Sequence, residues 1–198
     1  MSTEPVDGGP RRLAVVLAAY GAEAAAPPGV DPGRFAGACL SDAYEVVADL
    51  VGVTSGIVGP SPVDELLWPG AVRLEPANGV PELVEQVEGR YDELLLVAAD
   101  APDLPGLVLA KIIRVLHRVG VAAAPERRGL GWVAVGLRLP VDGRARAVDL
   151  DTDAWATTQW PLRTPGWHRL RRPEDLALLD PGLEGWPATR RLLEGRPC

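Results

Sequence analysis

ELLLVAADAPD, residues 93–103, joins an apolar run to two carboxylates, Asp100 and Asp103, and the fold prediction starts from it. An apolar run of this length predicts a strand that is buried on both faces, as in the centre of a parallel sheet. Ligands of open α/β sheets bind just beyond the carboxyl ends of the strands, which is where Asp100 lies. Burying a carboxylate is costly unless it meets a cation or accepts hydrogen bonds. Asp100 is therefore either a ligand of a divalent metal beside a nucleotide phosphate, or an acid that caps the next helix or binds loop amides.

Composition narrows the class of protein. The chain has 198 residues, which fits one domain with a sizeable core, and its formal net charge of −7 argues against a nucleic-acid partner. No apolar run approaches the roughly 20 residues that cross a bilayer, so no membrane partner is expected. Residues 1–12 lack the apolar core of a signal peptide, which predicts a cytoplasmic protein. We expect residues 1–12 to be a disordered tail and residues 13–198 to be a single domain.

Apolar runs and helical spacing alternate along the chain, which predicts a mostly parallel sheet with helices on both faces. The predicted strands are residues 13–20, 53–58, 72–74, 93–98, 120–125 and 132–139, and the predicted helices are residues 35–50, 81–88, 103–119, 173–179 and 188–193. Asp103 is expected to cap the third of these helices. Lys111, the only lysine, is expected on the solvent face of that helix and away from any site.

Two other segments could contribute to a site at the strand ends. The loop at residues 21–33 lies where a nucleotide-binding fold holds phosphate, but it matches no phosphate-binding motif, and Arg34 is its only cation. Residues 148–153, VDLDTD, place Asp149, Asp151 and Asp153 on one face if the segment is a strand. That acidic edge is either a solvated surface or part of a metal site.

Three motifs resemble those of a known superfamily. Residues 98–104, AADAPDL, are similar to a strand motif of the type GDDCPDL; residues 125–137, PERRGLGWVAVGL, are similar to PAEDGGYWLIGL; and residues 169–176, RLRRPEDL, stand where many members have DVDTPEDL. The superfamily is the nucleotide-diphospho-sugar transferases with the GT-A fold. The chain looks most like a bacterial glycosyltransferase-like group (DUF2064) and its relatives, the molybdenum-cofactor and phospholactate guanylyltransferases.

The resemblance implies a three-layer α/β/α sandwich and a transferase that uses Mg²⁺ or Mn²⁺. In that interpretation the catalytic residue is Asp100, which would hold the metal with Asp151 or Asp153. The candidates for binding the nucleotide or nucleotide sugar are Arg34, Glu126, Arg127 and Arg128, and its phosphates would be held by Arg34 with Arg127 or Arg128.

The same motifs depart from the superfamily at charged positions. Ala99 replaces the first acid of the strand motif, and arginines replace the late Asp-x-Asp. Two hypotheses follow. The chain is a metal-dependent nucleotidyl- or glycosyltransferase, or it is a catalytically degenerate member that acts as a nucleotide-binding or protein-interaction module. Mn²⁺ at Asp100 would favour the first, and a site filled by side chains such as Tyr20 or Trp132 would favour the second.

Overall fold

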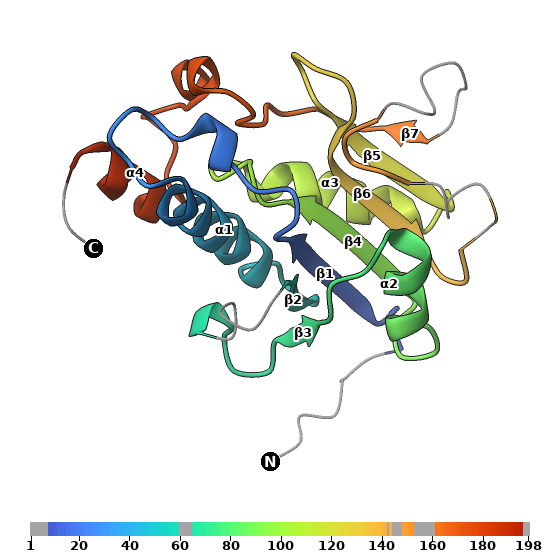
Figure 1. Cartoon of the computed structure of the whole chain (residues 1–198). Coiled ribbons are helices and arrows are strands. Elements are labelled where there is room, and N and C mark those ends of the chain that lie inside the picture. The colour runs from blue at the N-terminus through green and yellow to red at the C-terminus, as the bar shows by residue number, and fades with distance from the viewer. Residues whose placement is uncertain (1–7, 60–64, 142, 144–147, 153–160, 196–198) are drawn as a thin grey trace.

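Seven strands form one twisted sheet in the computed structural model, which describes residues 8–59, 65–141, 143, 148–152 and 161–195 (Figure 1). The strands are β1 Arg12–Leu17, β2 Thr54–Val58, β3 Val72–Leu74, β4 Glu93–Ala98, β5 Val121–Pro125, β6 Trp132–Arg138 and β7 Leu162–Arg163. Their order across the sheet is β3-β2-β1-β4-β6-β5-β7. Only β6 runs antiparallel to its neighbours, β4 and β5; the other pairs between these strands are parallel. The predicted mostly parallel sheet is confirmed.

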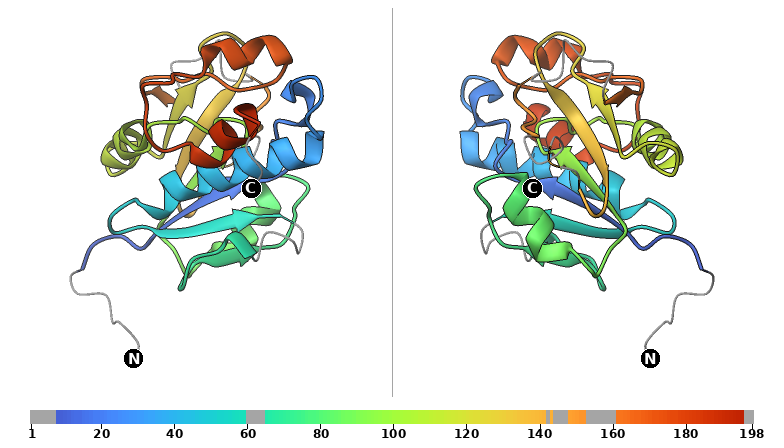
Figure 2. Two further views of the ribbon diagram at one scale, coloured as in Figure 1. Left: turned by 90° about the vertical axis from the view of Figure 1, so that its left-hand side faces the viewer. Right: turned by 90° about the vertical axis from the view of Figure 1, so that its right-hand side faces the viewer.

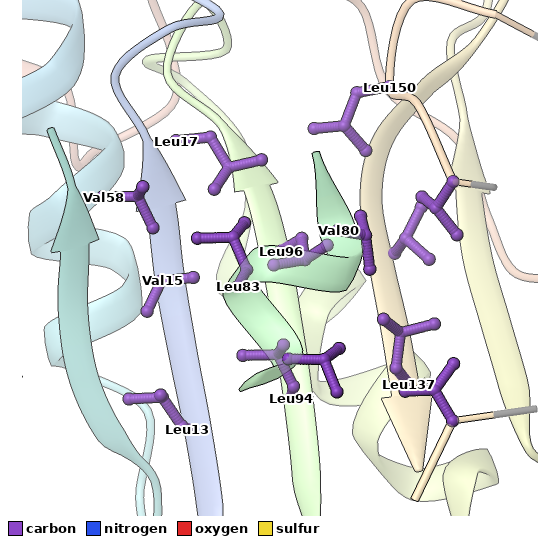
Figure 3. Packing of buried hydrophobic residues seen from close by; sticks show 14 of the residues in the cluster. Leu13, Val15, Leu17, Val58, Val80, Leu83, Leu94, Leu96, Leu137 and Leu150 are labelled. Carbon is purple, nitrogen blue, oxygen red and sulfur yellow. The ribbon is translucent and has the colours of Figure 1, made fainter. Parts of the chain in front are cut away.

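Helices cover both faces of this sheet (Figure 2). They are α1 Pro32–Ala48, α2 Val80–Val87, α3 Gly106–Leu116 and α4 Pro187–Leu193, with short 3₁₀ helices at Glu23–Ala25 and Pro173–Leu178. Apolar side chains of α2 pack on one face against alternate residues of β1 and β4, such as Leu13, Val15 and Leu94 (Figure 3). The intervening residues of the same strands pack on the other face against α1 and α3. The predicted three-layer sandwich is therefore confirmed.

The carboxyl end of the chain returns to α1 and forms a third apolar cluster. Leu170, Leu179 and Trp186 pack with Phe35 and Cys39. This return carries residues 167–170 past the end of β4, where the Leu170 amide donates a hydrogen bond to the Asp100 carbonyl at 2.7 Å. The late segment of the sequence is thus placed against the residue that ends the central strand. No helix in the described ranges is long and apolar enough to span a membrane.

Two local predictions are wrong. Asp103 does not cap α3, which has no side-chain cap. The Asp103 carboxylate instead accepts from Trp167 Nε1 at 3.0 Å, and it lies 2.9 Å from His168 Nε2. Tertiary partners thus replace the local amides. The segment from residue 148 is not a strand over its described part, because the Asp151 amide turns back to bond Asp149 Oδ1 at 2.9 Å. Asp153 lies outside the described residues.

Candidate functional site

Asp100 forms a buried ion pair at the end of β4. Its Oδ1 accepts from Arg169 Nε at 2.6 Å, and the side chains of Asp100 and Arg169 are 3% and 2% exposed. The backbone bond from Leu170 to Asp100 fixes the neighbouring Arg169 beside the strand end. A charge-assisted contact this short and this well buried is among the strong hydrogen bonds of proteins.

The remaining bonds of Arg169 fix the position of its guanidinium. Nη1 lies 2.8 Å from Asp151 Oδ1, 3.1 Å from the Leu150 carbonyl and 3.3 Å from the Trp132 carbonyl. The group also lies over the ring of Tyr20, 5.3 Å from its centroid. One cation therefore joins the end of β4, the start of β6 and the acidic segment at residues 149–151.

Arg171 supplies a second cation to the same cluster. Its Nη2 lies 2.9 Å from Asp151 Oδ1, and its Nε lies 3.1 Å from Glu126 Oε2. Asp151 is thus shared by two guanidiniums. The cluster is called the arginine–carboxylate cluster below and consists of Asp100, Glu126, Asp151, Arg169 and Arg171.

Burial changes the protonation of these groups. It raises the pKa of Asp100 to about 6, although Arg169 acts in the opposite direction. Burial also raises the pKa of Glu126, against the effect of Arg171. For Arg169, burial lowers the pKa, but Asp100 and Asp151 more than reverse this and leave it above its ordinary value. At pH 7 the cluster therefore holds an ionised Asp100 against a guanidinium that cannot lose its proton.

A cavity of about 820 Å³ lies next to the cluster, beyond the carboxyl ends of β1 and β2. Its walls are residues 17–21, residues 76–81 at the start of α2, and one face of α1. Tyr20 and Asp149 line it on the side of the cluster, and the Tyr20 hydroxyl donates to Asp149 Oδ1 at 3.0 Å. Tyr20 thus separates the cavity from Arg169. The volume is within the range of about 300–1,000 Å³ that small-molecule sites occupy.

The predicted site residues are only partly brought together. Asp100, Asp151 and Glu126 meet in the arginine–carboxylate cluster. Arg34 is exposed on α1, where its amide bonds the capping carboxylate of Asp31 at 2.9 Å. Of the two loop arginines, Arg127 lies over the Trp167 ring at 5.1 Å and Arg128 is exposed. None of these three arginines lines the cavity.

The described residues of the cluster do not fit a divalent metal. Mg²⁺ and Mn²⁺ sites need several oxygen ligands with free lone pairs. Within the described ranges, no group of three or more His, Cys, Asp or Glu residues is placed to share an ion. Asp100 Oδ1 and Asp151 Oδ1 already face Arg169. The guanidinium thus supplies the positive charge between these two carboxylates.

Sequence reasoning did not assign Arg169 and Arg171 to the site. Their signal was nevertheless present, because they occupy the place of the late Asp-x-Asp in the resemblance. Because arginines replace acids at that place, the chain itself supplies positive charge that the resemblance assigns to a metal ion. Asp149 was named only as part of an acidic edge, and its contact with Tyr20 spans 129 residues of sequence.

Comparisons with known proteins identify the fold. No family model matches the sequence, and no curated protein matches it. Among solved structures, a protein provisionally assigned as a nucleotide-diphospho-sugar transferase from Desulfovibrio desulfuricans G20 aligns with a TM-score of 0.59 and 15% identity, over 93% of this chain and 95% of that one. A 4-diphosphocytidyl-2C-methyl-D-erythritol synthase aligns with a TM-score of 0.56 and 16% identity, over 84% of this chain and 96% of that one.

A third similar structure is that of Rv0371c from Mycobacterium tuberculosis H37Rv in complex with manganese. It aligns with a TM-score of 0.50 and 20% identity, over 94% of this chain and 99% of that one. At these identities the likeness extends to the fold alone. The chain has the α/β fold seen in these structures.

Proposed function

We propose that this protein binds a nucleotide or nucleotide sugar through its nucleoside part, without a divalent metal, and that it is not a metal-dependent transferase. The observation that carries the proposal is the buried pair of Asp100 and Arg169, with its 2.6 Å contact. It favours the catalytically degenerate alternative over the transferase.

The pair opposes metal binding because Oδ1 of Asp100 and Oδ1 of Asp151 are already paired with a buried guanidinium. In metal-dependent transfer, the ion joins protein carboxylates to phosphate oxygens and neutralises charge in the transition state. In this chain Arg169 and Arg171 neutralise Asp100 and Asp151. Moving Arg169 away would break its bonds to the Leu150 and Trp132 carbonyls as well. The Leu150 carbonyl also accepts from the Trp132 amide at 2.9 Å, so the loss is that of two hydrogen bonds to a charged group, each of which contributes about 1.5–3 kcal/mol.

The position of the cavity supports binding of a nucleoside. In open α/β sheets, ligands bind outside the carboxyl ends of the strands, and the cavity lies there for β1 and β2. Its walls are mostly aliphatic, with Tyr20 as an aromatic surface and Asn78 as a polar side chain. A flat base beside a sugar fits such a mixture of apolar wall and few polar groups.

Calorimetric titration of the full chain tests the proposal. GTP, CTP, UTP and nucleotide sugars are titrated with EDTA, and again with Mg²⁺ or Mn²⁺. We expect at least one of them to bind with a Kd of ~0.1–1 mM, to bind equally well with EDTA and with metal, and to give no product. Affinity that rises tenfold with Mn²⁺, together with product release, would restore the transferase hypothesis. Absence of binding for every compound would leave only the protein-interaction alternative.

A further inference from the structure

No cationic side chain of the described residues lines the cavity. Its charged lining residues within the described part of the chain are two acids, Glu23 and Asp149, and no Lys or Arg lines it. Nucleotide phosphates are ordinarily held by guanidinium or ammonium groups. A ligand in this cavity therefore meets negative charge where a phosphorylated ligand would need positive charge.

Glu23 places a carboxylate against the loop that follows β1. A Cβ added at Gly21 would lie 2.5 Å from Glu23 Oε2, which means that the carboxylate rests on the Gly21 backbone. In the described part of the chain, Glu23 has no ion-pair partner. An anion approaching this loop meets an uncompensated carboxylate.

Asp149 adds a second carboxylate to the lining of the cavity. Its Oδ1 is used by the Tyr20 hydroxyl at 3.0 Å and by the Asp151 amide at 2.9 Å. Among the described contacts, its Oδ2 is left for a ligand. Burial, and then the charge of Asp149, raise the pKa of Tyr20 to about 12, so the phenol stays a donor to Asp149 at neutral pH.

Within the described ranges, the nearby cations do not line the cavity. The face of α1 that lines it consists of Gly33, Ala36, Gly37 and Leu40, which follow helical spacing and leave Arg34 off that face. Arg169 is 2% exposed, contacts the ring of Tyr20, and is already paired with acids. The net charge of −7 adds a repulsive background for anions.

From this geometry we infer that the cavity selects an unphosphorylated nucleoside over its phosphate esters. The base amino group and the sugar hydroxyls are donors that suit Glu23, Asp149 and the Asn78 carbonyl, and the aliphatic walls suit the faces of the base. The inference rests on the proposed function, because it names the chemical form of the ligand of the same cavity. It predicts an affinity order opposite to that of a site built to hold a triphosphate.

Titrations of the full chain in EDTA, with adenosine, guanosine, cytidine and uridine and with the 5′-monophosphate and 5′-triphosphate of each, test this order. We expect the nucleoside that binds best to bind about fivefold or more tightly than its triphosphate, as repulsion between nearby charges in water predicts. Lowering the salt concentration should widen the gap, because screening weakens. The double variant Glu23→Gln, Asp149→Asn should bring the two affinities to within about twofold.

Control variants and contrary outcomes separate this inference from the proposed function. Glu85→Gln changes the net charge on the exposed surface of α2, outside the cavity lining, and should leave the affinity ratio unchanged. A triphosphate that binds more tightly than its nucleoside would overturn the inference and leave the proposed function standing. If neither form of any nucleoside binds, the proposed function fails, and this inference fails with it.

Discussion

At the scale of single residues, the buried pair of Asp100 and Arg169 decides the chemistry of the strand end. Burying two charges is favourable only when they are paired in good geometry and their other polar atoms are bonded. Both conditions are met, since Arg169 also bonds two backbone carbonyls and Asp151. Removing one member should therefore cost much more than removing both.

Arg169→Met keeps an apolar stem and removes the cation, which leaves the Asp100 carboxylate buried without a partner. We expect the free energy of unfolding to fall by ~3–5 kcal/mol, measured by urea denaturation. Adding Asp100→Asn should recover part of that loss, because no unpaired buried charge remains. Lys111→Ala, at an exposed position of α3, is the control and should stay within ~0.5 kcal/mol of wild type. A double variant that is less stable than Arg169→Met alone would contradict this account.

The raised pKa of Asp100 also predicts how the free energy of unfolding changes with pH. Burial raises its pKa in the folded chain to about 6, whereas an unfolded Asp has a pKa of about 3.9. Between roughly pH 4 and pH 6 the folded chain therefore binds a proton that the unfolded chain has lost, and the free energy of unfolding falls as pH rises.

Other carboxyl groups titrate in the same range, so wild type is compared with Asp100→Asn at each pH. We expect the stability of wild type relative to the variant to decrease from about pH 4 to about pH 6, by urea denaturation in buffers of constant ionic strength. A relative increase would show that attraction to Arg169 outweighs burial of the carboxylate.

At the scale of elements, α3 approaches β6 closely because Gly136 has no side chain. A Cβ at this position would lie 2.5 Å from Ile112 Cγ2 and 2.9 Å from Leu116 Cδ1, and both side chains are buried. Gly136 therefore sets the distance between the central sheet and the helix that follows β4.

Gly136→Ala should lower the free energy of unfolding by ~1–3 kcal/mol, because α3 or its side chains must move to make room for a methyl group. Gly120→Ala is the matched control: no atom outside its chain neighbours lies within 4 Å of a Cβ there, so it should change stability by less than ~0.5 kcal/mol. Thermal and urea unfolding of both variants measure the difference. Equal stability of the two variants would show that α3 is not held at this distance.

At the scale of the whole molecule, features that depend on local pattern were predictable and features that depend on distant contacts were not. The apolar run that became β4 and the spacing of α3 each reflect a few neighbouring residues. The short β7 has only two residues and no such pattern, and it exists because it pairs with β5. Sequence periodicity cannot identify a strand of only two residues.

The predictions for the candidate site divide in the same way, into local features that were predictable and distant contacts that were not. Asp100 was predicted at the end of a buried strand, and it lies there. Its partner Arg169 is 69 residues away in sequence, and the two meet because the chain returns from α3 through the far edge of the sheet. Asp103, predicted to cap α3, is similarly bonded by Trp167, 64 residues later. Local rules assign such acids to the nearest helix, whereas the folded chain gives them tertiary partners.

The return of the carboxyl end also determines whether Cys39 is accessible. Asp42 accepts hydrogen bonds from the Ala188 and Thr189 amides at 2.9 and 2.7 Å, which holds the start of α4 against α1. Cys39 is fully buried beneath this contact, and burial raises the pKa of its thiol to about 12. The thiolate is the nucleophile that attacks a thiol reagent, so Cys39 should react only when α4 moves away from α1.

In a Cys198→Ser background, Asp42→Ala should increase the rate at which a thiol reagent labels Cys39 by about tenfold. Loss of the two bonds to the start of α4 lowers the cost of opening by roughly 1–2 kcal/mol, as for other helix caps. Asp49→Ala removes an exposed acid at the end of α1 and should leave the labelling rate unchanged. Labelling is followed in native buffer and compared with urea unfolding. The contrary outcome is that the labelling rate rises no more than the loss of global stability predicts. In that case α4 opens only together with the whole domain, and its contact with α1 is part of one cooperative unit.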